Sequence, residues 1–349
     1  MPKVLIVGAG LAGAAAAREL AASGRQVLLA EKSTEIGGKV RRYGCKADGK
    51  ASYKCVNCGL CLAKGLWSDV ENNSLIEIWL NTKVLDLSGN KGNYTAALKS
   101  GTEISYVHEI SDVVVAIGFD NITKTGFNGF VEIESAGPPP AASIIMGNDI
   151  ERIMKERTGA GLGGLFVKPP ENVAFIQCFG SRDIKEHAMY CSKVCCAYST
   201  RTARLIKNHY PDCGITFFYM EMQQVKSGNY FEEIKQLGAN FIKCRPVKIR
   251  DSSPARVSFD NPETGRREEH AFDLVVLADG IRPAGDTAKM AEICGLGQTE
   301  AGFLRYVKDI NHADSAGVYI TGCAKGPAKI EEAYADSIAV ARRISGARP

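Results

Sequence analysis

Short runs of apolar residues alternate with helical segments along most of the chain. Runs at 2–7 and 26–30 predict two strands, joined by a helix that extends to about residue 23. Further runs predict strands at 173–177, 214–220, 241–243 and 273–278, with helices at 190–209 and 230–237. Strands that are apolar throughout are typical of parallel sheets covered on both faces. The pattern predicts an α/β fold with two doubly wound sheets.

The turn after the first predicted strand carries the glycine pattern of dinucleotide-binding folds. Gly8 permits a tight turn, Gly10 lets the main chain approach a pyrophosphate, and Gly13 lets helix and strand pack closely. The start of the helix offers free N–H groups to phosphates. The second strand ends at Glu31, where a carboxylate accepts hydrogen bonds from ribose hydroxyls. A structural glycine turn is the alternative, but these offsets favour a dinucleotide site.

Three further segments resemble the thioredoxin and glutathione reductase superfamily of flavoproteins. They are the double glycine at 37–38, the strand and glycine at 112–118, and the segment 317–324, followed by a predicted helix at 324–341. The resemblance implies FAD as the dinucleotide. The residues implied for its site are Gly8, Gly10, Leu11, Ala12, Gly13, Glu31, Lys32, Gly38, Lys39, Val84, Ala116, Ile117, Gly118, Gly322, Cys323, Pro327 and Ile330. Cys323 departs from the superfamily, which usually carries Asp there; it is either a tolerated small residue or a thiol beside the flavin.

The middle of the chain repeats the doubly wound pattern without the glycine fingerprint. The loop after the strand at 173–177 keeps a single glycine, Gly180. The turn signal at 261–265, between short strands at 256–259 and 268–271, predicts a hairpin. Chain order predicts a discontinuous FAD-binding domain, 1–120 plus 286–349, with a cysteine-bearing insertion at 40–80. The domain between, 121–285, is expected to resemble an NAD(P)-binding domain.

The amino-acid composition excludes several classes of protein. The 349 residues are 45% hydrophobic and 23% charged with a net charge of +4, which suits two globular domains and does not indicate nucleic-acid binding. No apolar run approaches the roughly 20 residues that span a bilayer, and the first strand leaves no room for a signal peptide. We therefore expect a cytoplasmic protein without a membrane span. In a reducing compartment, its twelve cysteines indicate metal ligands or redox thiols rather than a disulfide framework.

Three cysteines at C-x2-C-x2-C spacing, together with one nearby, form the upstream cysteine group: Cys45, Cys55, Cys58 and Cys61. This spacing is used for three corners of a [4Fe–4S] cluster whose fourth ligand comes from elsewhere, and Cys45 is the nearest candidate. A structural zinc site and a redox-active C-x-x-C disulfide are alternatives. The third evenly spaced cysteine argues against a dithiol, and zinc rarely uses three thiolates this close. The spacing therefore favours an iron–sulfur cluster.

Four more cysteines have C-x12-C-x3-C-C spacing and form the downstream cysteine group: Cys178, Cys191, Cys195 and Cys196. Cys178 stands where a second glycine fingerprint would begin, between a buried strand and a helix. Thiolates at the end of a strand and on the following helix suit an iron–sulfur cluster better than a dinucleotide. The missing fingerprint also argues against a nicotinamide site in this domain.

The segment from 173 to 196, which contains the downstream group, resembles the flavin- and cluster-binding A subunit of heterodisulfide reductase, as does the ending 321–327. The resemblance covers nearly the whole chain and implies a [4Fe–4S] cluster on the downstream group, so that the two groups hold two clusters. The chain ends at Pro349 without the extra ferredoxin-like domains of methanogen members, and so looks like the short A-like subunit of the sulfur-oxidising heterodisulfide-reductase-like complex. The resemblance implies partner subunits, oxidation of sulfane sulfur on a carrier such as a lipoate-bearing protein, and a homodimer.

Electron transfer is the favoured function, because FAD exchanges two electrons and clusters pass them singly to partners. The first alternative is an NAD(P)H-dependent disulfide reductase of the thioredoxin reductase type, which requires a nicotinamide site. The second is a binding module in which clusters or zinc only stabilise the fold around an inert flavin. The sequence indicates no catalytic acid, base or nucleophile.

Overall fold

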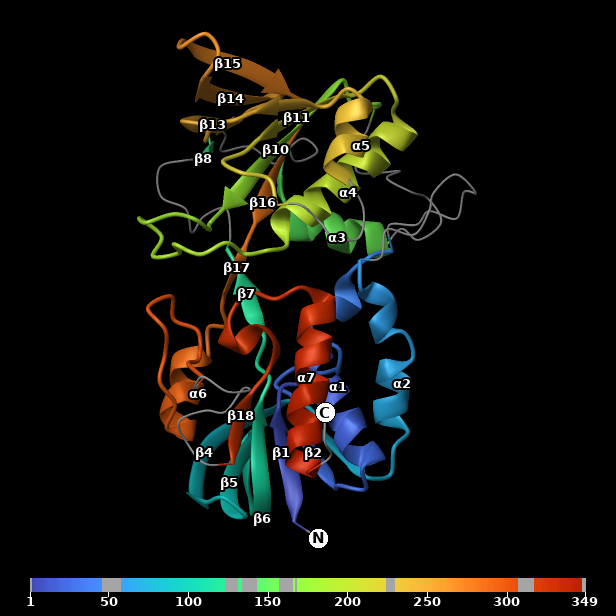
Figure 1. The fold of residues 1–349 in the computed structure, drawn as a ribbon, viewed down its shortest axis with the longest axis vertical. Coiled ribbons are helices and arrows are strands. Elements are labelled where there is room, and N and C mark those ends of the chain that lie inside the picture. Colours follow the sequence, from blue (N-terminus) through green and yellow to red (C-terminus); the bar gives the residue numbers. More distant parts are fainter. Residues whose placement is uncertain are drawn as a thin grey trace. The chain divides into compact units, whose positions relative to one another are not determined.

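The chain divides into two compact units (Figure 1). Unit 1 comprises Met1–Arg41, Cys58–Asp120 and Ile281–Pro349, and unit 2 comprises Arg42–Asn57 and Asn121–Gly280. The computed structural model describes residues 2–45, 58–122, 131–133, 143–156, 166, 168–223, 230–306 and 317–346. The strand β7 (Phe119–Asn121), where the chain leaves unit 1, pairs with β17 (Ile281–Pro283), where it returns.

Unit 1 is built on a parallel sheet that continues into an antiparallel meander. The parallel strands are, in order, β3 (Ile76–Trp79), β2 (Val27–Ala30), β1 (Lys3–Val7), β6 (Glu103–Val115) and β18 (Val318–Ile320). The first half of β6 pairs with β5 (Asn93–Ser100), which pairs with β4 (Thr82–Asn90). The long β6 therefore belongs to both parts, and only its end lies between β1 and β18.

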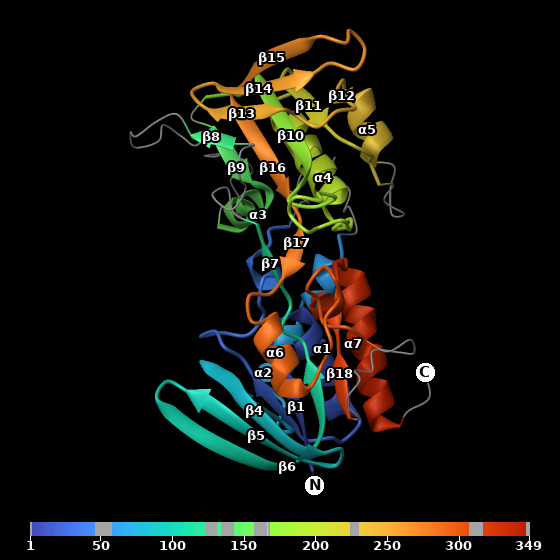
Figure 2. The ribbon, with the colours of Figure 1, turned by 90° about the vertical axis from the view of Figure 1, so that its left-hand side faces the viewer.

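Both faces of this parallel sheet are covered, which explains why its strands are apolar throughout. One face is covered by helices α1 (Leu11–Ala22), α2 (Leu66–Glu71) and α7 (Ile330–Ser345), and the other by the meander and α6 (Thr287–Cys294) (Figure 2). In β1, Val4 and Ile6 face the three helices, whereas Leu5 and Val7 face the meander side. Burial of one such side chain contributes about 1.5–3 kcal/mol.

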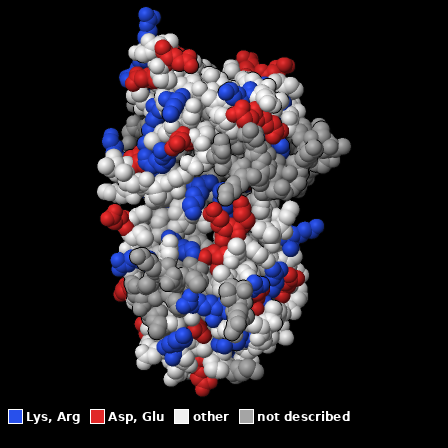
Figure 3. All heavy atoms as spheres, in the orientation of Figure 1, with Lys and Arg blue, Asp and Glu red and all other residues white. Residues whose placement is uncertain are grey.

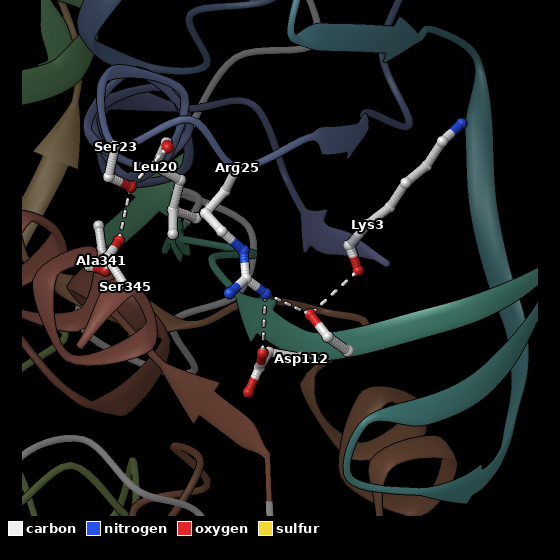
Figure 4. Close-up of polar contacts among 8 residues, drawn as sticks. Lys3, Leu20, Ser23, Arg25, Asp112, Ala341 and Ser345 are labelled. Carbon is white, nitrogen blue, oxygen red and sulfur yellow. Dashed lines mark hydrogen bonds and ion pairs between the residues drawn. The ribbon is translucent and has the colours of Figure 1, made fainter. Parts of the chain in front are cut away.

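Helices α1 and α7 lie side by side although they come from opposite ends of the described chain (Figure 1). At one end of this pair, the hydroxyl oxygens of Ser23 and Ser345 are 2.7 Å apart (Figure 4). Beyond α1, Nη2 of Arg25 donates a hydrogen bond to Oγ of Ser111 at 2.8 Å and lies 3.7 Å from a carboxylate oxygen of Asp112. These contacts tie the crossover between β1 and β2 to both α7 and β6.

Unit 2 contains a second parallel sheet, packed between helices and a smaller sheet. Its strands are, in order, β12 (Asn240–Ile242), β11 (Gly214–Phe218), β10 (Asn172–Phe179), β16 (Leu274–Asp279) and β9 (Ile144–Met146). One face packs against helices α3 (Gly147–Glu156), α4 (Cys195–His209) and α5 (Tyr230–Gln236). The other packs against a sheet of β15 (Arg267–Phe272), β14 (Ala255–Asp260), β13 (Lys248–Asp251) and β8 (Val131–Ile133).

The predicted fold class is confirmed, because each unit contains a parallel sheet of the dinucleotide-binding type; helices cover one face of each sheet, and the other face packs mainly against further strands. The predicted hairpin is formed by β14 and β15. Two helices begin later than predicted: α4 begins at Cys195 because Lys193 has a φ of 64°, and α7 begins at Ile330 because Gly326 has a φ of 149°, both outside the helical region. No helix within the described ranges is long and apolar enough to cross a membrane.

Candidate functional site

The glycine turn of unit 1, between β1 and α1, has the geometry that a phosphate group requires. Gly8 has a φ of 101°, and a Cβ placed on it would lie 2.5 Å from the main-chain oxygen of Ala116. A Cβ on Gly13 would lie 1.8 Å from the main-chain oxygen of Gly8. A Cβ on Gly10, in contrast, would have no described atom within 4 Å. The space over Gly10, where no side chain caps α1, is therefore open to a ligand.

The carboxylate of Glu31, at the end of β2, is fixed beside this turn. It is 7% exposed, and its two oxygens accept hydrogen bonds from the N–H groups of Ala9 at 2.7 Å and Ser33 at 2.9 Å. Each oxygen keeps a further lone pair that can accept from a ribose hydroxyl. Gly38 closes on the same turn, because a Cβ there would lie 3.1 Å from Cα of Gly10.

Two other predicted segments reach the glycine turn. The segment 116–118 follows β6, and a Cβ on Gly8 would contact its first two residues. Gly322 follows β18 with a φ of 64°, and a Cβ on it would lie 2.8 Å from Cβ of Ala12 in α1. The structure thus brings four predicted segments, distant in sequence, to one end of the parallel sheet.

A carboxylate from α7 holds the loop after β18. Asp336 accepts a hydrogen bond from the N–H of Gly322 at 2.9 Å and forms an ion pair with Lys325. Sequence reasoning missed Asp336, because no local pattern signals its contact with Gly322. The Cys323 thiol is 9% exposed and donates to the main-chain oxygen of Ala328 at 3.6 Å.

Both lysines predicted beside the cofactor form ion pairs. Nζ of Lys32 lies 2.7 Å from Asp286, and Nζ of Lys39 lies 3.6 Å from Asp120. On the face in Figure 3, basic and acidic side chains are interspersed. Three other predicted residues have their side chains in the core of unit 1: Leu11, Val84 and Ala116.

Two members of the upstream cysteine group, Cys58 and Cys61, lie in unit 1 against the start of α7. Cys61 belongs to the short helix η2 (Leu60–Ala63), and Gly59 lies between the two cysteines with a φ of 80°. A Cβ on Gly59 would lie 2.9 Å from Oε2 of Glu331 and 3.0 Å from Cβ of Ile330. The cysteine run therefore packs on the first turn of α7, which follows the loop that contains Gly322 and Pro327.

The downstream cysteine group lies at the end of β10 and the start of α4. Cys178 is 4% exposed with a φ of 59°, a conformation that costs a non-glycine residue about 1–3 kcal/mol. It therefore has a backbone suited to glycine but presents a thiol. Cys195 and Cys196 are the first residues of α4, where the helix dipole favours thiolates. Sγ of Cys191 accepts a hydrogen bond from the N–H of Lys193 at 3.3 Å.

The four downstream thiols influence one another. Burial is the main cause that raises the pKa of Cys178, of Cys195 and of Cys196, to about 11 for Cys196. Repulsion within every pair of the four sulfur atoms contributes further, so all four lie close together. Arg182 and Arg245 oppose the shift, because their charges lower the pKa of Cys178. Binding to metal would relieve this repulsion, since coordinated thiols are deprotonated and neutralised.

Asp279, at the end of β16, connects this group to the start of α3. Its carboxylate is buried and accepts hydrogen bonds from the N–H of Asn148 at 3.0 Å and from Nδ2 of Asn121 at 2.6 Å. Its main-chain oxygen accepts from the hydroxyl of Tyr198 at 3.1 Å and from Sγ of Cys195 at 3.7 Å. Burial raises the pKa of the Asp279 carboxyl to about 6.

Two buried polar side chains next to downstream cysteines have no hydrogen-bond partner among the described residues. Both amide atoms of Gln177, which is 3% exposed, are unpaired, and so is Oγ of the fully buried Ser199. Buried polar groups are nearly always paired, and an unpaired one costs about 1–3 kcal/mol. Sequence reasoning missed both, although Gln177 is the one polar residue in the apolar run 173–177.

No group of three or more His, Cys, Asp or Glu in the described part of the chain is arranged to hold a single metal ion. Thiolates of a [4Fe–4S] cluster bind different irons, and so lie farther apart than the ligands of one ion. In the upstream group, Cys55 lies outside the described residues and Cys45 is exposed and belongs to unit 2. The assignment of both groups as cluster ligands stays a prediction.

Comparison with known proteins gives relatives along the whole chain. The family described as NAD(P)-binding Rossmann-like domain matches residues 6–60, which include the glycine turn and Glu31. The second iron–sulfur A subunit of CoB–CoM heterodisulfide reductase from Methanopyrus kandleri is 25% identical over 99% of this chain and 64% of its own length. The A subunit of the H2:CoB–CoM heterodisulfide,ferredoxin reductase of Methanothermobacter thermautotrophicus is 24% identical over 98% of this chain and 63% of its own length. The chain spans less than two thirds of the length of these relatives.

Solved structures with the same fold include thioredoxin reductases. That of T. acidophilum has a TM-score of 0.62 at 17% identity, over 99% of this chain and 98% of the other. That of Lactococcus lactis has a TM-score of 0.61 at 17% identity, over 98% of this chain and 97% of the other. These neighbours confirm the thioredoxin reductase-like fold, and the names of the relatives support the prediction of an oxidoreductase. Over nearly its whole length, the chain is similar to proteins named as the A subunit of heterodisulfide reductase.

Proposed function

We propose that the chain is an electron-transfer flavoprotein subunit, with FAD in unit 1 and a [4Fe–4S] cluster on each cysteine group. One observation carries this proposal: in unit 2, the turn where a dinucleotide fingerprint would begin contains Cys178 in a glycine-like conformation, with three more thiols gathered around it. A strained thiol in place of a permissive glycine indicates a role for its sulfur. It also leaves unit 2 without the loop that receives a nicotinamide dinucleotide.

The donor set of the downstream group fits a cluster. Two of its thiols begin α4, and the guanidinium groups of Arg182 and Arg245 lie near a third. A cluster bound by four thiolates is net negative, so the helix dipole and these cations would stabilise it. Asp183 holds Arg245 in this position through an ion pair of 2.8 Å.

The residues of unit 1 fit FAD. The open space over Gly10 at the N-terminus of α1 would receive the pyrophosphate, and Glu31 would accept from the ribose. The loop at Gly322 touches α1 through Ala12 and leads to the start of α7, against which Gly59, between Cys58 and Cys61, packs. The segment that carries Cys58 and Cys61 and the loop that contains Gly322 therefore both contact α7. When bound, FAD would supply two-electron exchange and the clusters one-electron exchange.

The finer proposals rest on the family resemblance. The chain would work with other subunits of a heterodisulfide-reductase-like complex in cytoplasmic sulfur oxidation, exchange electrons with a carrier such as a lipoate-bearing protein, and form a homodimer. Relatives named as subunits support the existence of partners. The cysteine content suits a reducing compartment.

The proposal is tested by counting iron, acid-labile sulfide and zinc per flavin in anaerobically purified protein. Two cubane clusters predict about eight irons with equal sulfide. About four would leave one cysteine group without a cluster, and Cys45 would be the first ligand to reject. Zinc, or metal-free thiols, would overturn the proposal.

An NAD(P)H-dependent disulfide reductase is the second candidate, because the fold matches thioredoxin reductases from end to end. Anaerobic addition of NADH or NADPH separates the two functions. Bleaching of the flavin by either nucleotide would favour the disulfide reductase. A flavin that stays oxidised with both, yet is reduced by dithionite, would favour electron transfer within a complex.

A further inference from the structure

Gln177 and Ser199 come from different elements but face the same layer of unit 2. Gln177 follows Val173 and Phe175 at every second position of β10, and those two residues face the helices. Ser199 precedes Ala203 by one turn on the face of α4 that packs on the sheet. Both side chains therefore lie in the layer between β10 and α4.

The same two residues are next to downstream cysteines. Gln177 directly precedes Cys178, and Ser199 lies one helical turn after Cys195. Because side chains on a helix tilt toward its N-terminus, the hydroxyl of Ser199 leans toward Cys195. Serine hydroxyls within helices usually donate to the carbonyl four residues earlier, as Thr200 does to Cys196 at 2.8 Å, but Ser199 does not.

Hydrogen bonds to sulfur help to set the potential of iron–sulfur clusters, and these residues carry unused donors. The Gln177 amide has two N–H donors and Ser199 has one O–H donor, all unpaired among the described residues. We propose that Gln177 and Ser199 donate hydrogen bonds to sulfur atoms of the cluster on the downstream group and thereby raise its reduction potential. This inference rests on the proposed function, because it requires a cluster at that group.

The direction of the effect follows from charge. Reduction adds an electron to a cluster that is already negative, so donors directed at its sulfur atoms stabilise the reduced form more than the oxidised form. Removal of a donor should therefore lower the midpoint potential. For a one-electron reduction, a tenfold smaller equilibrium constant for forming the reduced cluster lowers the midpoint potential by 59 mV.

The test is an EPR-monitored redox titration of the complete, anaerobically purified protein. Gln177→Met keeps the side-chain length without its N–H groups, and Ser199→Ala removes only the hydroxyl. Gln236→Met, at an exposed glutamine of α5 in the same unit, is the matched control. The signal to be titrated is the one that Cys195→Ser abolishes, and iron and sulfide are counted in each variant.

We expect a downward shift of about 59 mV, or tenfold, in Q177M and in S199A, and the wild-type midpoint in Q236M. Wild-type midpoints in both Q177M and S199A, with full iron content, would overturn the inference and assign the unpaired groups to internal water. If Q177M does not retain iron, the shift in S199A decides the same question. Iron content that Cys195→Ser leaves unchanged would instead refute a cluster on the downstream group, and the inference with it.

Discussion

Substitution of Gly13 by alanine tests whether α1 must rest directly on the glycine turn. The added Cβ would lie 1.8 Å from the main-chain oxygen of Gly8, whereas ordinary contact begins at 3.4 Å, so α1 would have to withdraw by about 1.6 Å. The opposing atom is main chain, and no rotation of a side chain relieves the contact. Overpacking costs about 1–3 kcal/mol, and alanine regains about 1 kcal/mol of helix propensity over glycine.

Because a main-chain atom yields little, we take the upper end of that cost and expect Gly13→Ala to lower the free energy of unfolding of unit 1 by about 2 kcal/mol. The thermal midpoint should fall by roughly 4–8 °C for a unit of this size. Gly10→Ala is the matched control, because its Cβ meets no described atom within 4 Å and its φ of −69° suits alanine. Its stability should stay within about 1 kcal/mol of wild type, but its FAD content should fall, since the methyl group fills the space for the pyrophosphate.

Circular dichroism during heating measures the stability of these variants, and flavin absorbance after gel filtration measures FAD per chain. If G13A unfolds at the wild-type midpoint, the close approach of α1 to the turn is refuted. If G10A is as unstable as G13A, or retains full FAD, the space over Gly10 is not the pyrophosphate site.

Three further changes probe other contacts. Cys195→Ser should lower iron and sulfide per chain by about half and leave the flavin content unchanged. Cys213→Ser, at a buried cysteine outside both groups, is the control and should leave iron, sulfide and flavin at wild-type values. Equal losses of iron in the two variants would contradict the ligand assignment. Asp336→Ala leaves the N–H of Gly322 without its acceptor and should cost about 1–3 kcal/mol in urea unfolding, and a wild-type midpoint would show that the contact contributes nothing. Glu31→Gln turns an NH2 group toward a main-chain N–H donor, so it should lower the free energy of unfolding by about 1–3 kcal/mol and weaken FAD binding. A fluorescence titration that gives the wild-type affinity for FAD would disprove this.

The parts of the fold that depend on neighbours in sequence could be predicted. The spacing of Gly8, Gly10 and Gly13 between two apolar runs determines the β1–α1–β2 unit, because the close approaches at Gly8 and Gly13 require glycine. The hairpin of β14 and β15 is likewise determined by its turn residues at 261–265. Strands β4 and β5 were not predicted, because residues of β4 such as Asp86 are exposed and leave no continuous apolar run.

Features that require distant residues could not be predicted. Asp336 contacts Gly322 because α7 packs against the loop after β18, and no local pattern signals this. The gathering of the downstream cysteines could be predicted, since spacing and the strand–helix order imply it. The unpaired donors on Gln177 and Ser199 could not, because the sequence does not show which buried polar atoms lack a partner.

The pairing of α1 with α7 determines the order in which the two units can finish folding during synthesis. Unit 1 is complete only when β18 lies beside β6 and α7 lies beside α1, and both elements follow the last residue of unit 2. At a ribosomal rate of about 5–20 residues per second, the roughly 65 residues that follow Gly280 take about 3–13 s. Unit 2 has all its strands before this interval begins, whereas in unit 1 the strand β6 still lacks β18 and the helix α1 still lacks α7. A nascent chain can therefore complete unit 2, which carries the downstream cysteine group, before unit 1 has all of its strands and helices.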